Sequence, residues 1–181
     1  EGGSSTSVSK SDSKKKGGDR GGVRVVARFR PQNKNELKRG SGITGPVLTI
    51  SDDSTGIRFT TEAQKEMNIS EGAANFTFDY CFPTKTTQAQ VFEHTGEGMI
   101  PELFKGFNCT ILAYGQTGTG KTWSMMGLVG TENRGVIPRL VEGIFEGIQN
   151  SDVNIEFAVE VSYVEIYLEQ IKDLLQPAND N

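Results

Sequence analysis

Apolar and polar side chains alternate over nine residues between Ile155 and Tyr163. A period of two over this length predicts a β-strand with one apolar face. Shorter stretches with β-branched and aromatic residues predict further strands at residues 23–30, 47–50, 57–60 and 75–82. The second and third of these flank a turn-rich Ser-Asp-Asp-Ser-Thr-Gly segment and are expected to pair as a hairpin. Residues 61–74 are interpreted as an exposed loop insertion.

Apolar residues recur at every third or fourth position over residues 136–149, which predicts an amphipathic helix. A second helical pattern begins after Thr87, a residue type that caps helices, and runs to Phe104. Pro101 lies inside this pattern and is expected to kink or restart the helix. A last helical turn is predicted over residues 168–175.

A short apolar run at residues 108–113 predicts a buried strand of a parallel sheet. Strands and helices then alternate along the chain. This order predicts an α/β fold in which a mixed sheet is flanked by helices.

The first 22 residues consist mainly of Gly, Ser, Lys and Asp. Such a segment cannot bury enough surface to offset its ordering entropy, so we expect a disordered leader at 1–22 and an ordered domain at 23–181. Three consecutive lysines at 14–16 are interpreted as a solvated charge run, with contact to an anionic surface as the alternative.

Charge is divided unevenly between these parts. The leader carries five basic and three acidic residues, whereas the remainder carries 14 basic and 20 acidic residues. An acidic domain argues against a broad nucleic-acid-binding surface. The sequence contains no run of 18 apolar residues and no signal-peptide pattern, so membrane insertion and secretion are not expected.

The two cysteines, Cys81 and Cys109, have neither metal-site nor disulfide-framework spacing. We interpret them as reduced thiols of a cytosolic protein. The single histidine, His94, is interpreted as a surface residue of a helix because no second metal ligand lies near it in the sequence.

The motif with the clearest chemistry is a glycine-rich loop that fits the pattern G-x-x-x-x-G-K-[ST]. Its residues are Gly115, Gln116, Thr117, Gly118, Thr119, Gly120, Lys121 and Thr122. Glycines allow consecutive backbone N–H groups to surround phosphate oxygens, and the helix that follows adds its positive end. The lysine supplies a point charge to the outer phosphates, and the Thr122 hydroxyl can ligate Mg²⁺.

The motif predicts a nucleotide-binding protein but does not identify a catalytic residue. In such enzymes an apolar strand usually ends in an aspartate that holds Mg²⁺ through water. No aspartate after Thr122 ends an apolar strand, and Asp52 is better explained as a turn residue. The catalytic residues therefore remain unknown at this stage, and an accidental Gly/Thr-rich turn is the alternative interpretation.

Five segments together resemble the kinesin motor domain. They read VRVVARFRP, FTFDYCFP with QAQVFE, NCTILAYGQTGTGKTWSMMG, GVIPRLVEGIF and VEVSYVEIYLEQIKDLL. The Ala-Tyr-Gly-Gln-Thr-Gly-x-Gly-Lys-Thr core is more specific than a bare phosphate loop. The resemblance extends from Val23 to Leu175 and looks closest to conventional kinesin heavy chains. It implies the N-terminal portion of a P-loop NTPase fold.

The resemblance also implies roles for residues outside the loop. Arg28, Arg30 and Pro31 match the Arg-x-Arg-Pro segment that lines the adenine, and Trp123 stands where many kinesins place a ring against it. From the residues alone, an exposed strand face is the alternative for the two arginines. The implied ligands are ATP or ADP with Mg²⁺, the latter at Thr122.

As a complete domain, the resemblance implies a microtubule-stimulated ATPase in the cytoplasm, associated with the cytoskeleton. Its partners would be microtubules, with dimerisation only through a stalk that this sequence lacks, and no nucleic acid. The two family switch strings, Asn-x-x-Ser-Ser-Arg-Ser-His and Asp-x-Ala-Gly-Ser-Glu, do not occur. We therefore expect a partial motor domain. The alternatives are a nucleotide-binding module without hydrolysis, and an inactive motor fragment that folds poorly.

Overall fold

The computed structural model describes residues 22–33, residue 36 and residues 46–176. The predicted leader lies outside these residues, apart from Gly22. The chain divides into two compact units, one up to Lys85 and one from Thr86 onward. Each unit is described by itself.

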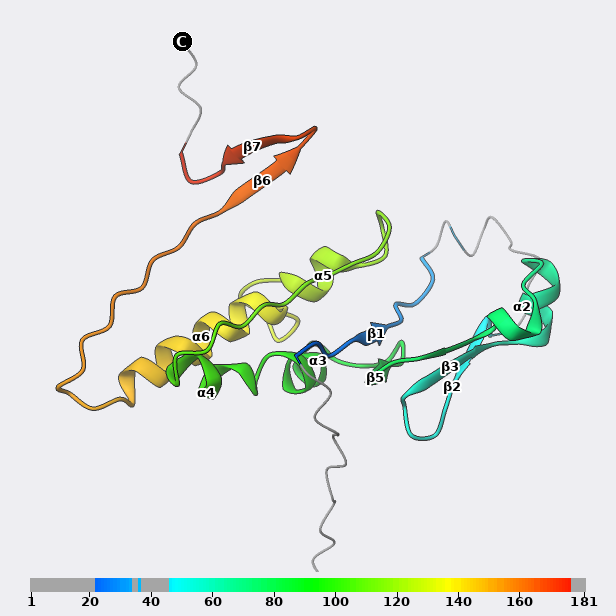
Figure 1. Cartoon of the computed structure of the whole chain (residues 1–181), viewed down its shortest axis with the longest axis horizontal. Helices are drawn as coiled ribbons and strands as arrows, with labels where there is room; N and C mark the ends of the chain where they lie inside the picture. Colours follow the sequence, from blue (N-terminus) through cyan, green and yellow to red (C-terminus); the bar gives the residue numbers. More distant parts are fainter. Residues whose placement is uncertain (1–21, 34–35, 37–45, 177–181) are drawn as a thin grey trace, which may run out of the picture. The chain divides into compact units, whose positions relative to one another are not determined.

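The N-terminal unit contains two small sheets. Strand β1 (Val26–Arg28) pairs in parallel with β5 (Tyr80–Phe82), and Ala27 lies opposite Cys81. Strands β2 (Leu48–Ile50), β3 (Gly56–Phe59) and β4 (Asn75–Thr77) form an antiparallel sheet in that order (Figure 1). The predicted hairpin between the segments at 47–50 and 57–60 is therefore confirmed.

The predicted strand at residues 75–82 is divided between these two sheets. Between β4 and β5, the Phe78 N–H donates to the Thr55 carbonyl at 2.7 Å. Asp79 then bonds the backbone of Val25 twice: its N–H donates to the Val25 carbonyl at 2.8 Å, and its carboxylate accepts from the Val25 N–H at 2.7 Å. These bonds lead the chain from β3, the partner of β4, to β1, the partner of β5. The predicted strand therefore changes its partner and is interrupted between β4 and β5.

The interpretation of residues 61–74 as an exposed loop was wrong. Helix α2 (Thr61–Glu66) and a 3₁₀ turn, η1 (Glu71–Ala73), occupy most of this segment. Thr60 caps α2 by accepting a hydrogen bond from the Ala63 N–H at 3.3 Å. Ala63 is fully buried, so this short helix packs on the unit through a single small residue that gives little periodic signal.

The core of the N-terminal unit is built from few residues. Its buried apolar side chains are those of Ile57, Ala63, Ala74, Cys81 and Phe82. Burial, and next the charge of Asp53, raise the pKa of the Cys81 thiol. Cys81 thus behaves as a small apolar core residue.

The C-terminal unit begins with two helices that follow the predicted pattern. Helix α3 (Gln88–Thr95) starts with a complete capping box, in which the Gln90 N–H donates to the Thr87 hydroxyl at 3.2 Å and the Thr87 N–H donates to the Gln90 side chain at 2.9 Å. Helix α4 (Met99–Phe104) has Pro101 in its first turn, where proline is tolerated. The predicted restart of the helix is confirmed.

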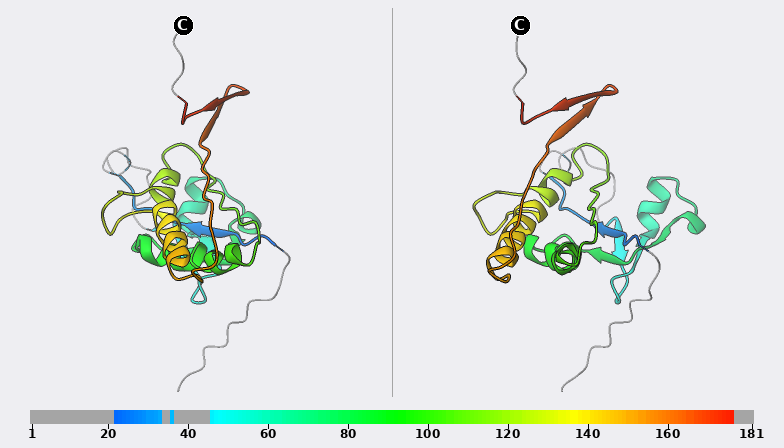
Figure 2. Two further views of the ribbon diagram at one scale, coloured as in Figure 1. Left: turned by 90° about the vertical axis from the view of Figure 1, so that its left-hand side faces the viewer. Right: turned by 60° about the vertical axis from the view of Figure 1, so that its left-hand side comes forward.

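Helix α6 (Val136–Gln149) has the bounds that its apolar stripe predicts. It lies alongside α3 and α4 (Figures 1 and 2). A Cβ added at Gly143 would lie 2.3 Å from the Ile100 δ-methyl, and one at Gly147 would lie 2.5 Å from the Phe104 ring. Two glycines one turn apart on α6 therefore face two apolar residues one turn apart on α4 and allow the helices to approach closely.

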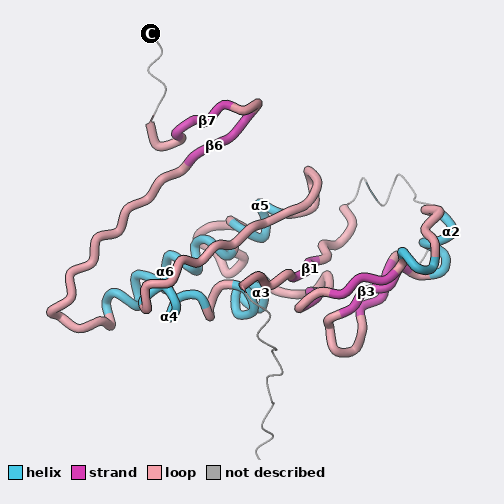
Figure 3. The backbone as a smooth tube through the Cα atoms, in the orientation of Figure 1, coloured by secondary structure: helices cyan, strands magenta, loops and turns pink. Residues whose placement is uncertain are grey.

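Two predicted strands are not formed among the described residues. Residues 108–113 and 155–163 take no part in a described ladder, and both are drawn as loop (Figure 3). Every second side chain from Ile155 to Tyr163 is apolar as predicted, yet all these residues are exposed. A strand needs a neighbour that shares its backbone hydrogen bonds, and the pattern of one segment does not supply that neighbour.

The predicted helical turn at residues 168–175 was also wrong. The segment belongs to a hairpin of β6 (Val164–Tyr167) and β7 (Gln170–Asp173). Its two-residue turn has positive φ at Leu168 (49°) and Glu169 (64°), which is the type I′ geometry that suits the twist of a hairpin. The spacing of Leu168, Leu174 and Leu175 was misleading, because apolar residues can also lie on both faces of a β-hairpin.

Among the described residues, no helix is both long enough and apolar enough to span a bilayer.

Candidate functional site

The glycine-rich loop runs directly into helix α5 (Lys121–Met125). Gly115, Gly118 and Gly120 have φ values of 151°, 83° and 102°, all in the region that residues with a Cβ avoid. The glycine positions of the motif are therefore required by the backbone itself. The predicted helix after the motif is confirmed, whereas the predicted strand before it is not formed.

The Lys121 side chain folds back over the loop. Its Nζ donates to the Gly115 carbonyl at 2.7 Å and to the Gln116 carbonyl at 2.9 Å. The Thr119 hydroxyl also donates to the Gln116 carbonyl at 2.8 Å, and a Cβ at Gly115 would come within 2.7 Å of this hydroxyl oxygen. Side chains of the loop and of α5 thus stabilise the loop, and they hold the positive charge of Lys121 beside it. A lysine ammonium beside backbone N–H groups is a donor set that fits phosphate.

Thr122 and Trp123 occupy the first turn of α5. Both are exposed, and Trp123 retains 41% of its accessible surface. The Ser124 N–H donates to the Gly120 carbonyl at 2.9 Å, which joins the helix to the last glycine of the loop. A hydroxyl in the second position of this helix is placed as a P-loop magnesium ligand requires.

No group of three or more His, Cys, Asp or Glu residues in the described part of the chain could hold a metal ion. A magnesium ion at a phosphate loop takes most of its ligands from phosphate oxygens and water. Thr122 therefore fits this ion without an acidic cluster.

Arg28, Arg30 and Pro31 lie in the N-terminal unit, in and just after β1. Arg28 is partly buried, and burial lowers the pKa of its guanidinium. Partial burial of both arginines argues against the exposed strand face that we considered as the alternative. Because the two units are described separately, a shared site formed by these residues and the loop remains a prediction.

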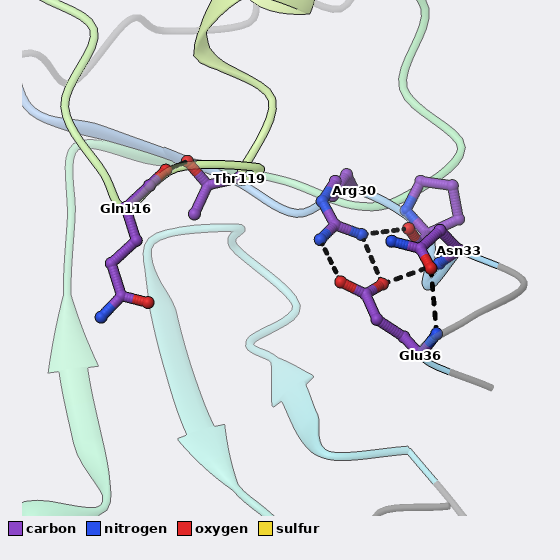
Figure 4. A network of polar contacts seen from close by, with 6 residues as sticks. Arg30, Asn33, Glu36, Gln116 and Thr119 are labelled. Carbon is purple, nitrogen blue, oxygen red and sulfur yellow. Dashed lines mark hydrogen bonds and ion pairs between the residues drawn. The ribbon is translucent and has the colours of Figure 1, made fainter. Parts of the chain in front are cut away.

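Arg30 is held by a carboxylate that sequence reasoning missed. It makes a bidentate ion pair with Glu36, with N···O distances of 2.7 and 2.5 Å (Figure 4). Glu36 in turn accepts from the Asn33 N–H at 2.7 Å, and the Glu36 N–H donates to the Asn33 side chain at 2.9 Å. The hydrogen bonds to Glu36 raise the pKa of Arg30. The Asn-x-x-Glu spacing of a capping box could have revealed the contact between Asn33 and Glu36, but not the ion pair with Arg30.

A second missed residue is Gln88, the first residue of α3. Its side chain is 3% exposed, and its Nε2 donates to the Trp123 carbonyl at 2.6 Å and to the Asn133 carbonyl at 3.2 Å. The contacts span 35 and 45 residues of sequence, so no local pattern signals them.

Comparisons with known proteins agree with the resemblance. The family model for the kinesin motor domain matches residues 28–181. The chain is 44% identical over 163 residues to kinesin-related protein 3 of Dictyostelium discoideum, covering 88% of this chain and 13% of the relative. It is 43% identical over 161 residues to the kinesin heavy chain of Neurospora crassa, covering 88% of this chain and 16% of the relative.

A solved structure described as that of a fast kinesin has a TM-score of 0.75 and 41% sequence identity to this chain. The match covers 88% of this chain and 42% of the solved chain. The chain therefore spans less than half of that structure and a small part of the full-length relatives.

Proposed function

Because this chain belongs to the kinesin motor domain family, we propose that it is the ATP-binding part of a microtubule motor. Its α/β architecture is that of the N-terminal portion of this P-loop NTPase fold. The observation that carries the proposal is the loop at 115–122, where three glycines have positive φ and the Lys121 side chain lies over the loop, an arrangement that supports phosphate binding.

Within this proposal, the backbone N–H groups of residues 115–120 hold the phosphates of ATP or ADP. Lys121 offsets charge on the outer phosphates, which it reaches from its position over the loop. Thr122 supplies a hydroxyl ligand to Mg²⁺, and this ion, when bound, neutralises charge between the β- and γ-phosphates. Catalysis of this kind consists mainly of positioning and electrostatic stabilisation.

The adenine is assigned to Trp123 together with Arg28, Arg30 and Pro31. An exposed indole offers a flat apolar face on which a purine can stack. The Glu36 carboxylate fixes the Arg30 guanidinium in one plane, which suits contact with a flat ring. If Trp123→Ala left ATP affinity unchanged, this assignment would be wrong.

Hydrolysis coupled to movement along microtubules is proposed for the whole motor, in the cytoplasm and on the cytoskeleton. The two switch strings that sense the γ-phosphate in kinesins are not among these 181 residues. The residues that position the attacking water are therefore not assigned to this chain, and neither is the stalk through which dimers would form. Nucleic acid is not among the proposed partners, because the domain is acidic.

A second candidate function is a nucleotide-binding module that does not hydrolyse ATP, or an inactive motor fragment. It is favoured by one observation on the described residues after Thr122: Asp152 does not end a strand, and Asp173 ends β7, whose sequence Gln-Ile-Lys-Asp is not apolar, so neither matches the usual water-mediated magnesium ligand. Saturable nucleotide binding without turnover would support it.

The deciding experiment measures phosphate release from Mg-ATP by the chain, with and without microtubules, for wild type and Lys121→Ala. Binding of ATP is measured in parallel. Lys105→Ala is the matched control because it removes the same charge from an exposed residue of the same unit that pairs only with a neighbouring helix residue, Glu102, at 2.7 Å in the described contacts.

Microtubule-stimulated release that Lys121→Ala abolishes and Lys105→Ala retains would support the motor function for the chain itself. Binding without release would favour the second candidate. We expect Lys121→Ala to weaken ATP binding by about 100-fold, which corresponds to a lost charge-assisted contact of roughly 2–3 kcal/mol. Undiminished binding by this variant would contradict the phosphate-loop proposal.

A further inference from the structure

Gln88 connects two helices of the C-terminal unit that are far apart in sequence. The side chain extends from the first residue of α3, and its amide nitrogen donates to the carbonyl of Trp123 at 2.6 Å. Because the side chain is almost fully buried, this hydrogen bond is shielded from water. A buried donor whose partner is removed carries a desolvation penalty, so the pair is expected to be formed most of the time.

Helix α5 has five residues, so the Trp123 carbonyl is among its last four. The last four carbonyls of a helix have no partner within the helix. The Thr122 carbonyl accepts from the Met126 and Gly127 N–H groups, at 2.8 and 3.2 Å. The next carbonyl, that of Trp123, accepts from Gln88 instead. Helix α5 has only five residues, so its orientation depends on such tertiary contacts rather than on helix propensity.

The backbone at Gly127 leaves room for the side-chain amide of Gln88. Gly127 has φ of 60°, and a Cβ at this position would lie 2.7 Å from the Gln88 Nε2 and 2.2 Å from the Asn133 carbonyl oxygen. Only glycine leaves this space. The second amide hydrogen reaches the Asn133 carbonyl at 3.2 Å, which ties the turn after α5 to the same donor.

The position of the donor is also fixed from its own side. Gln88 directly follows Thr87, whose hydroxyl and N–H form the capping box with Gln90. The start of α3 is therefore rigid at the residue from which the Gln88 side chain extends.

We propose that Gln88 is a positioning residue for the nucleotide base: by holding the backbone of Trp123, it orients the indole that contacts the adenine. This inference rests on the proposed function. It distinguishes two parts of one ligand, because the Lys121 side chain donates to the Gly115 and Gln116 carbonyls of the loop, whereas Gln88 donates to the Trp123 carbonyl. Loss of the amide should therefore affect recognition of the base more than recognition of the phosphates.

The test compares ATP with inorganic tripolyphosphate, which has the phosphates without the base, in the presence of Mg²⁺. Binding to the 181-residue chain is measured by calorimetry and by indole emission. Trp123 is the only tryptophan in the sequence, so its emission reports on this site alone. The main variant is Gln88→Met, which keeps the length of the side chain and removes both donors.

Gln149→Met is the matched control. It makes the same chemical change at an exposed residue of the same unit, the last residue of α6. Gln88→Asn is a milder second variant, which keeps an amide but shortens the side chain by one methylene. It allows the same comparison if Gln88→Met fails to fold.

We expect Gln88→Met to weaken ATP binding by about five- to tenfold, the range for a lost buried hydrogen bond, and to change tripolyphosphate binding by less than about twofold. The change in Trp123 emission on addition of ATP should also shrink. Gln88→Asn should show the same selective loss at a smaller size, and Gln149→Met should show none.

Equal loss of both ligands in the Gln88 variants, or no loss of either, would overturn the inference. The same would follow if Gln149→Met reproduced the selective loss. A wild-type chain that binds tripolyphosphate as tightly as ATP would overturn the inference and leave the phosphate loop intact. A wild-type chain that binds neither would overturn the proposed function and, with it, the inference.

Discussion

Asp53 organises the turn between β2 and β3 through its carboxylate. The carboxylate accepts from the Ser51 hydroxyl at 2.6 Å and from the Thr55 N–H at 3.1 Å. These hydrogen bonds, that of Ser51 first, lower the pKa of Asp53. The same turn is linked to β5, since the Cys81 N–H donates to the Ser54 carbonyl at 2.7 Å.

A lowered pKa in the folded state makes the turn sensitive to acid. The ionised carboxylate favours the folded turn at pH values above the ordinary aspartate pKa, and this contribution is lost as the pH falls through the lowered value. We expect the protection of the Thr55 and Gly56 amides, measured relative to the intrinsic exchange rate at each pH, to fall on acidification of the wild type, and the protection in Asp53→Asn to depend much less on pH. Asp52→Asn, the same change one residue earlier, should retain the wild-type acid response; loss of that response would contradict the role of Asp53.

Residues with a function of their own are predicted from the sequence with unequal success. The fixed glycines of the candidate phosphate loop are predictable because each meets a local requirement, such as the positive φ of Gly120. Gln88 is not, because its role depends on carbonyls that only the packing of α3 against the turn after α5 brings near. Glu36 is intermediate, since the spacing from Asn33 is visible but its contact with Arg30 is not.

Among the elements, α6 shows how small residues set the distance between helices. Gly143 and Gly147 are each expected to cost helix stability relative to alanine, by about 1 kcal/mol. A Cβ added at each glycine would, however, meet a different kind of side chain. A δ-methyl group of Ile100 lies over Gly143, whereas the ring of Phe104, which is also 5.8 Å from the Phe157 ring, lies over Gly147.

This difference predicts unequal effects of the two alanine substitutions. The Ile100 methyl can rotate away, so Gly143→Ala should stabilise the chain by up to about 1 kcal/mol through helix propensity. A flat ring with an aromatic neighbour yields less easily, so Gly147→Ala should be about 1 kcal/mol less stable than Gly143→Ala. Urea unfolding followed by circular dichroism checks the order of the two variants, and the reverse order would show that the Phe104 ring is not held in place.

The pattern at 136–149 predicted its element, and the equally clear pattern at 155–163 did not, for a physical reason. A helix such as α6 satisfies its hydrogen bonds within its own residues, so its local pattern determines its bounds. A strand takes its hydrogen bonds from a neighbour, so the strong alternation at 155–163 predicts an extended chain but not a ladder. The hairpin of β6 and β7 likewise depends on its Leu168–Glu169 turn, which lacks the usual Asn-Gly signal.

At the scale of the whole molecule, apolar side chains are exposed over a long continuous segment. They extend from Val153 through the hairpin to Leu175 and include Ile155, Val159, Val161, Ile166 and Ile171. An extended chain with an apolar face and accessible backbone groups is a template for pairing with another chain. This property follows from the segment itself and does not depend on nucleotide.

A charge in the middle of this apolar face should reduce association. Val159 is 56% exposed, and Val159→Lys is expected to lower the weight-average mass at high protein concentration by about twofold or more, as gatekeeper charges do. Light scattering after size-exclusion chromatography measures this mass. Ser162→Lys, which makes the same change of charge on the opposite side of the extended segment, is the control and should have a smaller effect. Equal effects would attribute the change to net charge instead.

The turn between α5 and α6 has a hydrogen-bonded base and an exposed tip. Gly127 and Arg134 form an isolated bridge at its base, and the Leu128 N–H donates to the Asn133 carbonyl at 3.0 Å. On the α6 side, the Arg139 guanidinium donates to the Glu132 carbonyl at 2.8 Å. Val129, at the tip, is 64% exposed. A nitroxide attached through a cysteine at position 129 would therefore move with α5, and its electron paramagnetic resonance spectrum would report whether that helix reorients when a nucleotide is added.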